Sequence, residues 1–83
     1  MNNQTSYQRI KSQIPADTLL FFRVGGFYEL YFEDAQRAAP ILDVALTSRD
    51  GIPLCSIPHH QLDKYLARAI RCNKKVAICD EYT

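Results

Sequence analysis

The sequence predicts an α/β (α+β) domain in which helices pack on a small mixed β-sheet. Apolar residues recur at helical spacing in three segments, and five other segments are short and rich in apolar or β-branched residues. Two turn signals, Gly25-Gly26 and the RDG at 49–51, separate pairs of these strand-like segments. The predicted order is therefore α-β-β-α-β-β-α-β, which is typical of a mixed sheet covered by helices.

The first element is predicted to be a helix over residues 6–14. Tyr7, Ile10 and Ile14 stand at helical spacing, and Pro15 ends the segment.

The next two elements are predicted to be a β-hairpin. Residues 18–24 are apolar on both faces until Arg23, as in an interior strand. Gly25 and Gly26 can supply the positive φ angles of a two-residue turn. The second hairpin strand is predicted over residues 27–32.

A second helix is predicted over residues 33–43. Glu33 and Asp34 stand in its first turn, where acidic side chains favour the positive end of the helix dipole. Pro40 removes one backbone hydrogen bond and is expected to kink or shorten the last turn.

The remaining elements are a second hairpin, a third helix and a final strand. Residues 44–48 and 52–57 flank the RDG turn and are predicted to be strands. Pro58 suits a first helical position, and Asn73 can adopt the left-handed conformation that closes a helix. Residues 75–81 are predicted to be the last strand. One apolar face is predicted along the third helix, through to Cys72: Leu62, Tyr65, Leu66, Ala69 and Ile70.

The segment FYELYF at residues 27–32 carries the most informative pattern. Alternate side chains of a strand share a face. One face is uniformly large and apolar and is predicted to be the core face: Tyr28, Leu30 and Phe32. The other face carries Phe27, Glu29 and Tyr31. Because an isolated carboxylate is very costly to bury, this second face is expected to meet water or a partner.

Two interpretations of Phe27 and Glu29 follow. In the first interpretation, Phe27 caps a small core and Glu29 is a solvated strand residue, because single exposed aromatic residues are common. Alternatively, Phe27 is an apolar wedge beside a hydrogen-bonding acid. Proteins that insert a side chain between base steps from the minor groove use this combination.

Composition limits the function classes. The length of 83 residues predicts a single domain, 1–83. A net charge of +1 argues against tight autonomous binding to nucleic acid, which is usually the property of a clearly basic domain. Three cysteines without a CxxC pair, in a chain without a signal-like start, fit a reducing, cytoplasmic setting. The apolar runs are too short to cross a bilayer, so no membrane partner is expected.

Metal and nucleophile chemistry have weaker signals. Cys55, His59 and His60 suggest a metal set, but adjacent helical histidines diverge by about 100° and the spacing matches no zinc pattern. The two histidines are interpreted as the helix start and as neighbours of a phosphate. Cys55, Cys72 and Cys79 are expected to pack as small apolar side chains. A Cys–His enzyme would need an orienting acid and an oxyanion hole, for which the sequence has no signal.

A modest basic cluster lies near the end of the third helix. It has two interpretations, a solvated face that complements the helix dipole or a set of phosphate contacts. Its members are Arg68, Arg71, Lys74 and Lys75.

Five collinear segments resemble the mismatch-recognition domain of the MutS DNA mismatch repair proteins. GGFYELYFEDAQRAA is similar to the family's glycine–acid–FYELF segment, and LLFFRVG to the strand before it. ILDVALTSRDG, IPLCSIPHHQLDKYLARAI and KVAICDE resemble later family segments in the same order and spacing. The resemblance runs from about Tyr7 to Glu81.

The resemblance implies a mechanism and a site. The family's phenylalanine stacks on a mispaired or unpaired base from the minor groove, and its glutamate hydrogen-bonds that base. Carried over by position, these residues are Phe27 and Glu29. Arg49 and His60 are the further candidate DNA contacts. The implied partner is double-stranded DNA with a mismatch or an unpaired base.

The sequence also departs from the family. Gly26 stands where the family has an acidic residue. The 83 residues lack the segment that completes the family's first domain and lack its connector, clamp and ATPase domains. No G-x-x-x-x-G-K-[ST] phosphate loop is present, so ATP hydrolysis is not expected of this chain. Neither a cofactor nor a small-molecule substrate is expected.

The preferred hypothesis is therefore a non-catalytic DNA-binding module. The alternative is a stand-alone interaction module that kept the fold and lost mismatch recognition. It would use the aromatic surface of Phe27 and Tyr31 to bind other MutS-type domains or a second copy.

Overall fold

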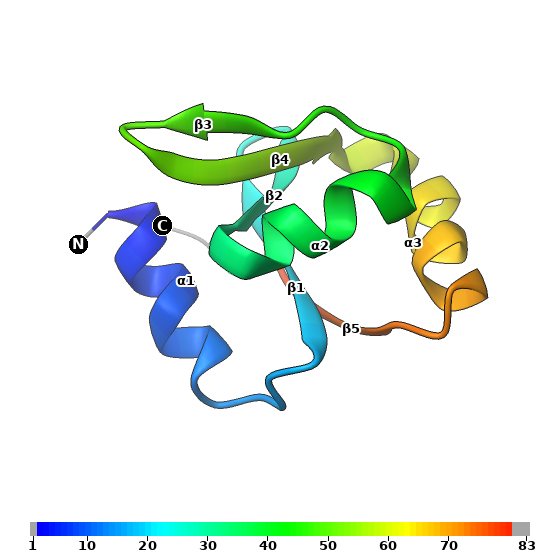
Figure 1. Ribbon diagram of the computed structural model, residues 1–83, viewed down its shortest axis with the longest axis horizontal. Coiled ribbons are helices and arrows are strands. Elements are labelled where there is room, and N and C mark those ends of the chain that lie inside the picture. Colours follow the sequence, from blue (N-terminus) through cyan, green and yellow to red (C-terminus); the bar gives the residue numbers. More distant parts are fainter. Residues whose placement is uncertain (1, 81–83) are drawn as a thin grey trace.

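A computed structural model describes residues 2–80 and shows helices on both faces of a five-stranded sheet (Figure 1). In Figure 1, α1 (blue) and α3 (yellow to orange) lie at opposite sides of the molecule. The elements are α1 (Asn3–Lys11), β1 (Thr18–Val24), β2 (Phe27–Tyr31), α2 (Phe32–Leu42), β3 (Thr47–Arg49), β4 (Ile52–Pro58), the 3₁₀ helix η1 (His59–Gln61), α3 (Leu62–Arg71) and β5 (Lys75–Cys79).

The sheet has the strand order β3-β4-β2-β1-β5. Antiparallel pairs join β3 to β4, β4 to β2 and β2 to β1, whereas β5 pairs with β1 in parallel. The predicted mixed sheet and element order are confirmed, with η1 added before α3. Residue 81, predicted as part of the last strand, lies outside the described residues.

Two apolar clusters lie on opposite faces of the sheet. Leu19, Phe21, Tyr28 and Leu30 pack against buried residues of α2 and α3. The other cluster lies beneath α1 and consists of Tyr7, Leu20, Phe22, Tyr31 and Leu54. The sheet is thus buried on both faces, which explains why residues 19–22 are apolar without alternation.

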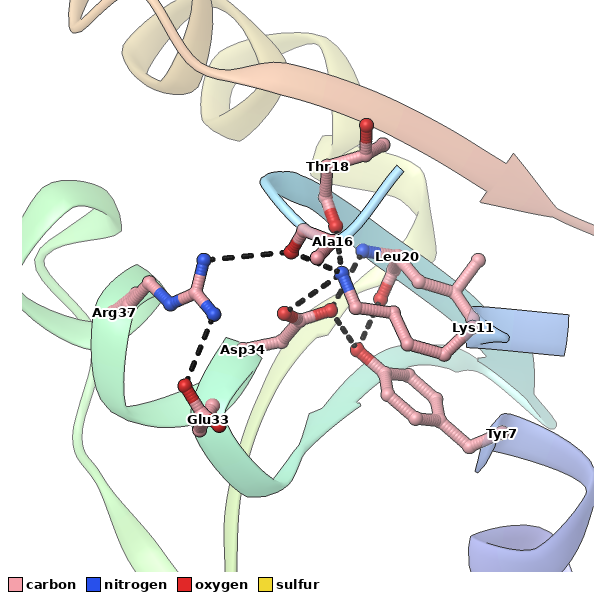
Figure 2. A network of polar contacts seen from close by, with 8 residues as sticks. All are labelled: Tyr7, Lys11, Ala16, Thr18, Leu20, Glu33, Asp34 and Arg37. Carbon is pink, nitrogen blue, oxygen red and sulfur yellow. Dashed lines mark hydrogen bonds and ion pairs between the residues drawn. The ribbon is translucent and has the colours of Figure 1, made fainter. Parts of the chain in front are cut away.

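A buried polar network joins α1 to the sheet and to α2 (Figure 2). The Tyr7 hydroxyl lies 2.7 Å from Asp34 Oδ2 and 2.9 Å from the Leu20 carbonyl oxygen. The Leu20 N–H donates to the same Oδ2 at 3.1 Å. Burial, and then the neighbouring Asp34 carboxylate, raises the pKa of Tyr7, so its hydroxyl keeps its proton.

Lys11 completes this network. Its ammonium forms an ion pair with Asp34 Oδ1 at 3.1 Å, in a geometry that does not meet the angle of a hydrogen bond. The same ammonium donates hydrogen bonds to the carbonyl oxygen of Ala16, at 3.1 Å, and to that of Thr18. Asp34 was predicted only as a dipole-favouring acid at the start of a helix. It is instead 2% exposed and connects α2 to α1 and β1. Its burial is tolerated because the carboxylate is ion-paired and hydrogen-bonded.

Three helix predictions need correction. α1 begins at Asn3, earlier than predicted, because the Asn2 side chain caps it by accepting from the Thr5 N–H at 2.8 Å. α2 continues past Pro40 to Leu42, so this proline does not shorten it. Ile70 does not share the buried face of α3, since it is 59% exposed.

Phe32 does not lie on the core face predicted for it. The strand ends at Tyr31, and Phe32 begins α2 with a φ of 59°. Its ring therefore packs on the α1 side, near Tyr7 and Tyr31, and away from Tyr28. Positive φ is uncommon for a bulky residue, and this residue directs the chain from the sheet into the helix.

The second hairpin and the following turn also differ from the prediction. β3 covers Thr47–Arg49 and not residues 44–48. Its turn residues Asp50 and Gly51 both have positive φ, 52° and 78°, as a type I′ turn requires. Pro58 is the last residue of β4, and η1 separates it from α3. Asn73 has the left-handed conformation predicted for it, with a φ of 60°.

The Tyr7→Phe substitution is expected to lower the free energy of unfolding by about 1–3 kcal/mol, because it removes the hydroxyl that satisfies buried oxygens of Asp34 and Leu20. Urea unfolding measures the loss. Tyr65→Phe is the control, since the Tyr65 hydroxyl has no hydrogen bond within residues 2–80. Equal losses in the two variants would contradict the role given to Tyr7.

Gly25 and Gly26 are expected to respond differently to alanine. Gly25 has a φ of 59°, whereas Gly26 lies outside the left-handed region, and a Cβ at either glycine meets open space. Gly25→Ala should therefore lose about 1–2 kcal/mol of stability, a cost set by the backbone alone. Gly26→Ala should leave stability unchanged or raise it by up to about 1 kcal/mol. Thermal unfolding of the two variants checks this order, and the reverse order would refute the turn geometry.

Candidate nucleic-acid interface

Phe27 begins β2 at the end of the glycine turn and is 49% exposed. It pairs with Pro58 of β4 and Val24 of β1, so the sheet fixes its backbone on both sides. The exposed position predicted for Phe27 is confirmed. An apolar ring that is half-exposed on a fixed backbone is suited to insertion against a flat apolar partner.

Glu29 is buried, contrary to the prediction that its face meets water or a partner. It is 7% exposed, and Tyr31, the next residue on this face, is covered by Tyr7 of α1. The Tyr31 hydroxyl donates a hydrogen bond to Glu29 Oε1, and Arg49 Nη2 lies 3.8 Å from Glu29 Oε2. The carboxylate is therefore satisfied within the protein, which offsets the cost of removing it from water.

Tyr31 is fully buried and cannot contribute the exposed aromatic surface expected of an interaction module. Its ring meets the Tyr7 ring edge to face, with centroids 5.1 Å apart and an interplanar angle of 88°. Burial, and then the hydrogen bond to Glu29, raises the pKa of Tyr31. Tyr31 is thus a hydrogen-bond donor at neutral pH.

Arg49 ends β3 and brings a guanidinium to the same site from the edge of the sheet. Its side chain is 54% exposed, and it reaches Glu29 across the intervening strand β4. An ion pair at this exposure and distance is weak, so the guanidinium can exchange Glu29 for another anion.

His60 lies beside the turn that carries Phe27. The backbone N–H of His59 donates to the Gly26 carbonyl oxygen at 2.9 Å, which holds the start of η1 against this turn. The imidazoles of His59 and His60 are both exposed, and their ring centroids lie 6.2 Å apart. The structure therefore brings Arg49 into contact with Glu29 and places the start of η1, with His60, beside the turn before Phe27. Glu29 is buried, whereas Phe27, Arg49 and His60 are exposed.

The fold separates the cysteine and histidine residues that were considered for metal binding or catalysis. Cys55 is buried in the cluster under α2 and α3, away from the exposed His59 and His60. Burial raises the pKa of the Cys55 thiol to about 12, which keeps it protonated and unreactive. Cys72 is exposed, so the expectation that it packs as an apolar side chain is wrong. Within residues 2–80 no three metal-ligating side chains come together, and no helix is long and apolar enough to span a membrane.

The basic cluster is partly engaged within the protein. Arg68 donates to the Leu42 carbonyl oxygen at 2.6 Å and lies over the Tyr65 ring. Lys75 pairs with Asp17 at 3.6 Å. These contacts favour a structural and solvated role for this face over a set of phosphate contacts.

The residues that support Glu29, namely Tyr31 and the Tyr7 ring packed against it, were not predicted from the sequence. The available signals were two tyrosines in otherwise apolar segments, and the four-residue spacing of Tyr7 and Lys11 that puts both on one helix face. Buried tyrosines usually have a hydrogen-bond partner.

Comparison with known proteins agrees with this architecture. A family model described as MutS domain I matches residues 2–83. The chain is 51% identical over 80 residues to the DNA mismatch repair protein MutS of Desulfitobacterium hafniense (strain Y51) and 49% identical over 80 residues to that of Desulfatibacillum aliphaticivorans. It is 51% identical over 73 residues to that of Leptospira interrogans serovar copenhageni.

These alignments cover 87–90% of this chain but only 8–9% of each relative, so the chain spans less than a tenth of their length. The family model matches the chain from its second residue to its last. The fold, with its five-stranded mixed sheet and three α-helices, is consistent with that match. The chain belongs to the MutS domain I family.

Proposed function

We propose that this chain is a non-catalytic DNA-binding module that recognises a mispaired or unpaired base in double-stranded DNA. The observation that carries the proposal is the half-exposed Phe27 at the end of a hairpin turn, two residues before the carboxylate of Glu29 on the same strand face. The name shared by the relatives, DNA mismatch repair protein, supports the choice of ligand.

Phe27 acts as the wedge in this proposal. Inserting an apolar side chain from the minor groove costs on the order of a few kcal/mol of unstacking per base step. Stacking on an aromatic ring returns roughly 1–3 kcal/mol per base. The balance is least unfavourable where a base is already badly paired, so preference for such sites follows from the deformability of the DNA.

Glu29 acts as the acid that reads the displaced base, by accepting a hydrogen bond from a base N–H. The guanidinium of Arg49, which contacts Glu29 in the free chain, offsets the repulsion between this carboxylate and the nearby phosphates. Arg49 and the exposed His60 are the proposed phosphate contacts near the wedge. Phosphate contacts of this kind fix the position of a protein on DNA without reading its sequence.

The affinity of the 83-residue chain is expected to be low. A net charge of +1 supplies little counterion release, which provides most of the sequence-independent affinity for DNA. In the longer relatives, the rest of the polypeptide would add affinity, and this segment would supply the recognition of the mismatch. The chain has no phosphate-loop sequence, so we assign it no ATP hydrolysis.

Phe27→Ala is expected to abolish the preference for a duplex with one unpaired base while leaving binding to the matched duplex unchanged. Loss of stacking should weaken binding to the unpaired-base duplex by about 1–3 kcal/mol. Fluorescence anisotropy of the two labelled duplexes, titrated at low salt, measures both affinities.

Ile70→Ala is the matched control, because it removes another exposed apolar side chain from α3, which packs on the other face of the sheet. It should keep the preference of the parent chain. A parent chain without any preference, or a preference that survives Phe27→Ala, would refute the proposed function.

A further inference from the structure

The two oxygens of the Glu29 carboxylate have different surroundings. Oε1 accepts a hydrogen bond from the Tyr31 hydroxyl, in a part of the site from which solvent is excluded. Oε2 meets only the Arg49 guanidinium within residues 2–80, at 3.8 Å, and that guanidinium is half-exposed. One oxygen is therefore held by the protein, and the other has a partner that it can exchange.

The group that holds Oε1 is fixed in turn. Tyr31 is 0% exposed, and its ring is packed edge to face against the ring of Tyr7. The Tyr7 hydroxyl is bound to Asp34 and to the backbone of Leu20. A continuous path of packed and hydrogen-bonded groups thus runs from the buried Asp34 to Glu29, and it leaves Tyr31 little freedom to move its hydroxyl.

We propose that Tyr31 is a positioning residue for Glu29. Its hydroxyl donates a hydrogen bond to Oε1 and thereby fixes the rotamer of the carboxylate, so that Oε2 faces a base. This inference rests on the proposed function. On DNA, a phosphate replaces Glu29 as the partner of Arg49, and Oε2 then accepts one N–H. The ligand class is therefore a displaced base that offers an N–H donor, and a base edge with acceptors alone is disfavoured.

Without the Tyr31 hydroxyl, the carboxylate can turn, and Arg49 can engage both of its oxygens. Such a carboxylate must be reoriented when the base arrives. A loss of preorganisation weakens binding only in the complex that uses the carboxylate. The effect should therefore appear with the unpaired-base duplex and not with the matched one.

The test is a double-mutant cycle on the 83-residue chain, with Tyr31→Phe, Glu29→Gln and their combination. The quantity measured is the ratio of the Kd for a matched duplex to the Kd for a duplex with one unpaired thymine, which offers an imino N–H. Tyr31→Phe should lower this ratio roughly three- to tenfold, which is the net effect of one typical hydrogen bond in a protein. Added to Glu29→Gln, it should lower the ratio no further, because Tyr31 acts through Glu29.

Tyr28→Phe is the matched control. Tyr28 lies on the same strand and also donates its hydroxyl to a carboxylate, but that carboxylate belongs to Asp80, and Tyr28 faces the other cluster. This variant should keep the ratio of the parent chain. Circular dichroism and thermal unfolding of each variant establish that all of them are folded at the temperature of the titration.

Three results would overturn the inference. An unchanged ratio in Tyr31→Phe, with the preference still lost in Phe27→Ala, would refute the role of Tyr31 and leave the proposed function standing. An equal effect of Tyr31→Phe with and without Glu29→Gln would show a general structural role. A parent chain with a ratio of one would refute the proposed function, and the inference with it.

Discussion

The contact between the Tyr7 hydroxyl and the Asp34 carboxylate is the constraint on which the rest of the structure depends. It joins α1, near the N-terminus, to the first turn of α2, and the same carboxylate oxygen accepts the Leu20 N–H of the interior strand β1. With Lys11 paired to the other oxygen, α1 is fixed over one face of the sheet. A small domain buries only somewhat over half of the surface that its unfolded chain exposes, so a second covered sheet face adds substantially to its core.

That second layer determines the character of the site. Where α1 covers the strand, Tyr31 is fully buried and Glu29 nearly so; beyond its reach, at the glycine turn, Phe27 is half-exposed. One strand face thus changes from buried to exposed over five residues. The proposed wedge and reading acid differ accordingly: the ring is free to meet a ligand, whereas the carboxylate is held by Tyr31 and Arg49 before any ligand arrives.

Much of the fold could be predicted from local patterns, since turn residues and periodicity act over short distances. The bounds of β1, the left-handed Asn73 and the RDG turn follow from such signals. The surroundings of Glu29 could not be predicted this way, because strand alternation assigns a side chain to a face without saying what covers that face. Tyr7 is 22 residues from Glu29 in the sequence, and only the packing of α1 brings it behind Tyr31.

The most direct measurement of the central claim is the aromatic proton NMR spectrum of the chain with a duplex that contains one unpaired base. Stacking of Phe27 on a base predicts an upfield ring-current shift of the Phe27 resonances, with those of the buried Tyr7 unchanged. The matched duplex should not produce this shift. A Phe27 ring that does not shift, or that shifts equally with both duplexes, would contradict the account.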